Sequence, residues 1–132
     1  MSIEPRPTRL PTPPGLEPRG PYTPAVRAGD FVFLSGQIGL SPETGRLADG
    51  GVQAQARQTL SNITAILTAA GLTVHDIARA VIYLSDIADW AAVNDVYEAF
   101  FDGAAVPART AIAVTGLPLS ALVEIEITAL AR

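Results

Sequence analysis

Apolar side chains recur at helical spacing in two segments of this chain. Within residues 52–70 they fall three or four positions apart, at Leu60, Ile63, Ile66 and Leu67. A second segment runs from about Ile87 or Ala88 to Phe101, and its apolar positions are Val93, Val96, Tyr97 and Phe100. The pattern predicts two amphipathic helices, the first ended by Gly71 and the second capped by Asp86.

Strand candidates lie before, between and after these helices. They cover residues 30–35, 77–84, about 108–115 and about 122–131, and a turn-like sequence at residues 41–45 follows the first run. In order, the elements are β-β-α-β-α-β-β. This order predicts an α+β fold in which two helices cover one face of a mixed sheet.

Proline is concentrated near the N-terminus, where residues 4–24 hold eight of the chain's eleven prolines. Proline fixes φ and lacks a backbone N–H, so this segment is expected to be extended and to stay out of the centre of a sheet. The composition predicts an arm, either mobile or lying on another surface. We therefore divide the chain into an arm of residues 1–19 and a single domain of residues 20–132.

The composition of the chain argues against several classes of function. With 132 residues the chain is long enough for one core. A net charge of −4, scattered arginines and the lack of lysine argue against a nucleic-acid surface. No cysteine and a single histidine argue against thiolate chemistry and against a dedicated metal site. No stretch has the length of a membrane span and no signal peptide is recognisable, so we expect a cytoplasmic protein without a membrane partner.

Two isolated charges stand out in the closing strands. Arg109 lies in PARTAIAV and Glu124 in ALVEIEITAL, each among apolar or small residues. A buried unpaired charge is costly, so such residues are usually partnered or functional. On neighbouring strands, an arginine that binds a carboxylate and a glutamate that accepts a proton suggest a small acidic substrate. The alternative is a structural ion pair between Arg109 and either Glu124 or Glu126.

The last predicted strand alternates between apolar and polar positions. Its apolar residues are expected to pack under the helices: Val123, Ile125, Ile127 and Ala129. We expect the other face of the sheet to carry Arg109, Ala111 and Ala113 of the neighbouring strand and to be small and partly polar. That face needs a cover, which a second copy of the chain would supply. We therefore predict a homo-oligomer with the site at its interface.

Seven sequence motifs from Gly20 to near the C-terminus together resemble the RidA/YjgF family of imine deaminases. They are Gly20-Pro21-Tyr22, SGQIGLSPETG at 35–45, QARQTLSNI at 55–63, AAGL at 69–72, VNDVYEAFF at 93–101, PAR at 107–109 and VEIE at 123–126. Because they occur in the family's order and spacing, the chain is identified as a member of that family.

The resemblance implies both a fold and a reaction. The implied fold is chorismate-mutase-like, in a homotrimer with three clefts between subunits. Enzymes of this family hydrolyse 2-iminopropanoate and 2-iminobutanoate, which arise from enamines such as 2-aminoacrylate, to the 2-oxo acid and ammonia. No cofactor is expected, because the protonated imine carbon is already electrophilic.

The resemblance also implies roles for the two isolated charges. Arg109 would bind the substrate carboxylate, whose geometry its planar fork fits and lysine does not. Glu124 would position or activate the attacking water, and Arg109 nearby would help keep it ionised. Glu126 falls on the same strand face by the period of two, and we expect a solvated or salt-bridged side chain there.

Five further positions are expected near the substrate: Tyr22, Ser35, Gly36, Asn94 and Ala111. The ring of Tyr22 would close the cleft from a neighbouring chain, or serve only as a packing anchor. The Ser35 hydroxyl and the Gly36 backbone, which has no side chain, could approach the ligand; alternatively, the two residues form a simple turn. Asn94 is either near the cleft or an exposed polar helix residue. Ala111 stands where many relatives have cysteine, and its backbone N–H would still reach the substrate.

Several alternatives remain. His75, the only histidine, lies in a polar stretch that no family motif uses, and we expect it to be exposed in a loop. A non-catalytic module that binds 2-oxo acids, or a relative that acts on a different imine, is the alternative to the deaminase. Ribonuclease activity, also described for the family, ranks low because the chain offers no basic groove and no assigned acid–base pair.

Overall fold

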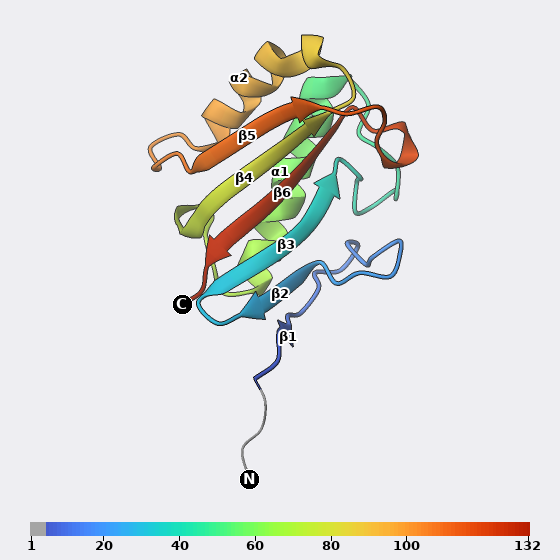
Figure 1. Cartoon of the computed structure of the whole chain (residues 1–132). Helices are drawn as coiled ribbons and strands as arrows, with labels where there is room; N and C mark the ends of the chain where they lie inside the picture. The colour runs from blue at the N-terminus through green and yellow to red at the C-terminus, as the bar shows by residue number, and fades with distance from the viewer. Residues whose placement is uncertain (1–4) are drawn as a thin grey trace.

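The computed structural model describes residues 5–132 as a six-stranded sheet with two α-helices behind it (Figure 1). The strands are β1 (Thr8–Arg9), β2 (Ala25–Ala28), β3 (Phe31–Ile38), β4 (Ile77–Leu84), β5 (Ala108–Ala113) and β6 (Val123–Leu130). The helices are α1 (Val52–Ala69) and α2 (Trp90–Phe100). The α+β class is confirmed, and the predicted strand 77–84 coincides with β4.

The strands are ordered β1-β2-β3-β6-β4-β5, and every neighbouring pair is antiparallel except β4 and β5. Parallel strands need a crossover connection, which α2 provides here. As a result, β4 lies between β5 and β6. The expectation that Arg109 and Glu124 stand on neighbouring strands is therefore wrong, because strands that are consecutive in the chain are not adjacent in this sheet.

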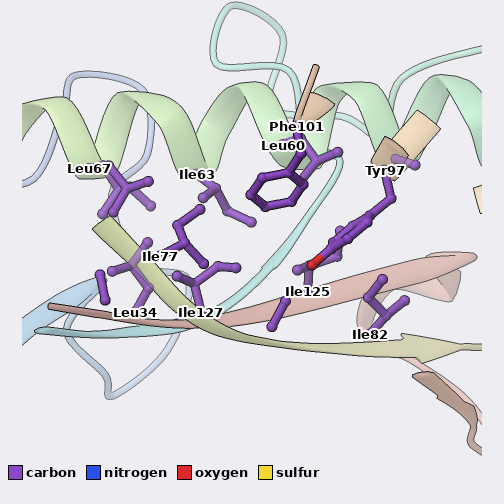
Figure 2. Close-up of a cluster of buried hydrophobic side chains, with 14 of the residues drawn as sticks. Leu34, Leu60, Ile63, Leu67, Ile77, Ile82, Tyr97, Phe101, Ile125 and Ile127 are labelled. Carbon is purple, nitrogen blue, oxygen red and sulfur yellow. The ribbon is translucent and has the colours of Figure 1, made fainter. Parts of the chain in front are cut away.

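The core fills the space between the helices and one face of the sheet, as Figure 2 shows for α1, β4 and β6. The four apolar positions predicted in the first helix and the four predicted in the last strand are all at most 3 % exposed. Burying an aliphatic side chain of this size contributes about 1.5–3 kcal/mol, so these two faces orient α1 on the sheet. No helix within residues 5–132 is long and apolar enough to cross a membrane.

The helix ends follow the predicted signals with one difference. Gly71 has a φ of 76° just after α1, a conformation that favours glycine. The second helical segment is divided, because a 3-10 turn at Ile87–Asp89 precedes α2. Asp86 caps that turn, since its Oδ1 accepts a hydrogen bond of 2.9 Å from the Ala88 N–H. The predicted start at residue 87 or 88 thus marks the turn, and α2 itself begins at Trp90.

The proline-rich arm lies along the edge of its own sheet. Thr8 and Arg9 pair with β2 as the outermost strand, and the Leu10 N–H donates to the Ala25 carbonyl at 3.0 Å. Leu16 packs against the margin of the core. The prolines keep the segment out of the sheet centre as predicted, and the surface on which the arm lies belongs to the same chain.

The face of the sheet opposite the helices is uncovered in the single chain. Phe31 and Phe33 of β3 are 45 % and 46 % exposed on it, with ring centroids 6.4 Å apart. Ile112 of β5 and Leu130 of β6 are exposed on the same face. The face is partly polar as expected, since β6 places Glu124, Glu126 and Thr128 on it. The expectation of small side chains is wrong, because the aromatic side chains come from β3, outside the two closing strands. An apolar face of this kind favours burial against another surface.

Candidate functional site

β3 is irregular where it passes the middle of β6. Between two regular stretches, Ser35 and Gly36 together oppose the single residue Glu126. Such a β-bulge bends the strand and redirects its side chains. The Ser35 hydroxyl donates to the Thr23 carbonyl at 2.6 Å. The bulge therefore fastens the end of β3 to the segment that carries Tyr22.

Glu124 projects from β6 onto the open face, and its carboxylate lies against the backbone of Gly36. A Cβ atom at position 36 would stand 2.5 Å from Glu124 Oε2 and 3.0 Å from its Cδ. Any larger residue would displace the carboxylate, so this close approach requires glycine. Gly36 is thus a spacing residue for Glu124 as well as a candidate for ligand contact.

The environment of Glu124 favours its protonated form. Burial raises the pKa of this carboxyl above the usual glutamate range, and the negative charge of Glu126 raises it further. Glu126 is exposed, as expected for a solvated side chain, and its Oε1 accepts a hydrogen bond from the Tyr83 hydroxyl at 2.8 Å. The expectation that Arg109 keeps Glu124 ionised is wrong within one chain, because Arg109 does not act on this pKa.

A pocket of about 680 Å³ lies beside the bulge, and we call it the Glu124 pocket. Its walls come from the arm, the end of β3, the turn that follows β3 and the loop before β6. Four of the predicted site residues line it together: Tyr22, Ser35, Gly36 and Glu124. Tyr22 is 44 % exposed, and its hydroxyl accepts a hydrogen bond of 3.2 Å from the Arg19 N–H. The arm thereby positions the tyrosine at the pocket.

Arg109 is held by a second set of residues. Its Nη1 donates to Asn94 Oδ1 at 2.7 Å. Its Cζ lies 5.5 Å from the ring centroid of Trp90 and 5.0 Å from that of Tyr97. A neutral amide and two aromatic rings hold a guanidinium in place without neutralising its charge. We call these four residues of β5 and α2 the Arg109 cluster.

The sequence interpretation missed Trp90 and assigned Tyr97 to the core alone. A signal was available, because Trp90, Asn94 and Tyr97 are spaced by four and three and share one helix face. The alternative that Asn94 is simply an exposed helix residue is wrong, since it is half-buried and bonded to Arg109.

The Glu124 pocket and the Arg109 cluster lie on opposite faces of the sheet. Arg109 pairs in register with Ala80, which is fully buried under the helices, and its side chain meets α2. Ala111 and Ala113 share this face by the period of two. The expectation that the three β5 residues lie on the open face is wrong, because pairing with β4 sets the orientation of β5.

The alternative of a structural ion pair at Arg109 is also wrong. Within residues 5–132 the ion pair that forms joins Arg132 to Asp76 at 3.1 Å and includes neither Arg109 nor Glu124. His75 is exposed in a 3-10 turn, as expected for a residue outside the site. The site residues thus provide two separate chemical groups. The Glu124 carboxylate can transfer a proton, and the Arg109 guanidinium can bind an anion.

Comparisons with known proteins identify the family and the fold of this chain. Residues 13–131 match the family model described as endoribonuclease L-PSP. A 2-iminobutanoate/2-iminopropanoate deaminase of Salmonella typhimurium is 46 % identical over 115 residues, which cover 86 % of this chain and 89 % of that protein.

Solved structures show the same fold. A Rid-family protein of Yersinia pestis has a TM-score of 0.90 at 37 % identity, over 95 % of this chain and 99 % of that one. Escherichia coli TdcF with bound serine has a TM-score of 0.83 at 40 % identity, over 94 % of both chains. The six-stranded sheet with two helices is therefore the fold of these proteins.

Proposed function

The chain belongs to the RidA/YjgF family, and we propose that it hydrolyses 2-iminopropanoate and 2-iminobutanoate to the corresponding 2-oxo acid and ammonia. One observation carries this proposal: the chain presents two incomplete half-sites of complementary charge. The carboxylate of Glu124 has a raised pKa in an open pocket. The guanidinium of Arg109 is held only by neutral partners. Perturbed or unneutralised charges of this kind cluster at functional sites.

We further propose that the two half-sites meet between copies of the chain. Opposite faces of one sheet cannot bring Arg109 to Glu124, whereas a second copy on the open face can place its β5 edge beside the pocket. Phe31 and Phe33 supply apolar surface that such contact would bury. We expect a homotrimer, and sedimentation equilibrium would then give the mass of three 13.8 kDa chains.

In the proposed cleft, Arg109 of one chain binds the substrate carboxylate through two parallel hydrogen bonds. Asn94 and Trp90 fix the plane of the guanidinium and hence the orientation of the substrate. Tyr22 and Glu124 are supplied by the other chain. The imine carbon is then placed between a fixed positive charge and a proton-transfer group.

The reaction consumes one water molecule. Ionised Glu124 takes a proton from the water as the oxygen bonds to the protonated imine carbon, and the C=N π electrons move to nitrogen. Glu124 then gives the proton to that nitrogen. The C–N bond breaks as the hydroxyl oxygen forms the new carbonyl, and the hydroxyl proton leaves with ammonia as ammonium. A raised pKa suits Glu124 because it must both take and return a proton near neutral pH.

A coupled assay tests the proposal. Threonine dehydratase generates 2-iminobutanoate in the presence of semicarbazide, which traps imine that has not been hydrolysed. Added protein is expected to lower semicarbazone formation and to speed the appearance of 2-oxobutanoate. No acceleration by the folded protein would contradict the deaminase. If the protein then bound 2-oxobutanoate, it would be a binding module.

A further inference from the structure

The rim of the Glu124 pocket carries a leucine in an unfavourable backbone conformation. In the 3-10 turn Pro118–Ser120, Leu119 has φ 56° and ψ 26°, and Ser120 has φ 58°. These are the only non-glycine residues with positive φ in the described part of the chain. The left-handed conformation is unfavourable for residues with a Cβ atom. Strain of this kind is concentrated at binding and catalytic sites.

The strain does not serve to bury the leucine within its own chain. Leu119 is 57 % exposed, whereas Ala121 is 1 % exposed at the point where the chain enters β6. Leu119 and Pro118 both line the pocket. The loop therefore holds a large apolar side chain at the pocket rim, at a cost in backbone energy and in exposed apolar surface.

Three further apolar side chains line this pocket together with Leu119. Leu16 comes from the arm, and Ile38 and Leu40 come from the end of β3 and the residues after it. All three are half-buried. The pocket also has polar walls, which include Glu17 and Arg19 of the arm, so its apolar surface is confined to the side formed by these three residues and Leu119. A ligand that places a polar reacting group at Glu124 could direct an apolar side chain toward this apolar part of the wall.

We propose that Leu119 is a specificity-determining residue that contacts the side chain of the 2-imino acid and favours apolar side chains longer than ethyl. This inference rests on the proposed function and adds a substrate preference to it. Each methylene that Leu119 helps to remove from water is expected to raise kcat/KM about fourfold. The imine of leucine should therefore gain more from Leu119 than the imine of alanine.

The test compares these two imines, each generated from its amino acid by an L-amino acid oxidase with semicarbazide as the trap. In Leu119→Ala, kcat/KM for the leucine imine is expected to fall about tenfold, while that for the alanine imine changes less than twofold. Ser120→Gly is the matched control. It relieves left-handed strain at the next residue, leaves the apolar wall intact, and should leave the ratio of the two kcat/KM values unchanged.

Two results would overturn the proposal. One is an unchanged ratio in Leu119→Ala. The other is an equal loss on both imines together with a lower mass in sedimentation, because Leu119 would then be a subunit contact.

A binding measurement separates this inference from the proposed function. If the wild-type protein hydrolyses neither imine, the proposed function fails, and affinities for 4-methyl-2-oxopentanoate and pyruvate test Leu119 independently. The fluorescence of Trp90, the chain's only tryptophan, can report this binding. A preference for the longer 2-oxo acid that is lost in Leu119→Ala supports the role of Leu119. Equal preference in both proteins overturns it.

Discussion

The Glu124 pocket and the Arg109 cluster are built in different ways. The pocket is assembled from segments far apart in the sequence, and its shape depends on backbone features such as the bulge at Ser35 and Gly36. The cluster depends on side-chain spacing along one helix and on its contact with one strand. The pocket supplies space and a proton-transfer group, whereas the cluster supplies a fixed positive charge. Neither can perform the proposed reaction alone.

The electrostatics of the pocket and of the cluster also indicate that neither can perform the proposed reaction alone. Glu124 is disfavoured in its ionised form by burial and by Glu126. Arg109 is stabilised by an amide and by aromatic rings, which leave its charge available. An anionic substrate bound between Glu124 and Arg109 would be stabilised by the positive charge of Arg109. The arginine would then also favour the ionised form of Glu124, an effect that the single chain lacks.

Removing the charge of the Arg109 cluster is expected to have the largest effect. Arg109→Ala should lower kcat/KM about a thousandfold or more, because a bidentate charge-assisted contact to the substrate carboxylate is lost. The semicarbazide assay measures this loss, and circular dichroism and sedimentation should show an unchanged fold and mass. Arg57→Ala, at an exposed arginine of α1, is the control. An Arg109→Ala protein that unfolds would instead support a structural role.

Removing the proton-transfer group of the pocket is expected to have the next largest effect. Glu124→Gln should lose turnover about a hundredfold or more while still binding 2-oxobutanoate, because Arg109 remains. Its thermal stability at neutral pH should rise, since the ionised carboxylate is disfavoured by burial, and this gain should vanish in acid where Glu124 is protonated. Glu98→Gln, at an exposed position of α2, is the control. Full turnover in Glu124→Gln would remove Glu124 from the mechanism.

Mixing these two inactive proteins tests whether the half-sites belong to different chains. If they meet at an interface, refolding Arg109→Ala with Glu124→Gln in equal amounts should restore about a quarter of the wild-type activity, since one interface in four then carries both intact side chains. Each protein refolded alone is the control. No recovery from mixed oligomers of the correct mass would show that the two residues do not act together across an interface.

The sequence allowed α1, β4 and the buried face of β6 to be predicted, because local periodicity alone decides which side chains they bury. The prediction placed Arg109 on the wrong face of the sheet. The orientation of β5 is set by its parallel pairing with β4, and that pairing depends on the crossover through α2. The resemblance selected Tyr22, Ser35, Gly36 and Glu124, which the structure brings together. No local pattern predicted the close approach of Glu124 to Gly36, because it arises from a bulge between strands distant in sequence.

The smallest expected effect concerns the pKa of Glu124, and it separates the pocket's own electrostatics from those of the Arg109 cluster. Activity requires ionised Glu124, so kcat/KM should fall as the pH drops through this pKa. Because the charge of Glu126 raises that pKa, Glu126→Gln should move the acid limb of the pH profile to lower pH while leaving the plateau nearly unchanged. Tyr83→Phe is the matched control, since it removes the hydroxyl that donates to Glu126 and keeps both carboxylates. An acid limb that does not move in Glu126→Gln would mean that the pKa of Glu124 in the free protein is set by the partner's Arg109 and not by Glu126. The two half-sites would then be coupled electrostatically before substrate binds.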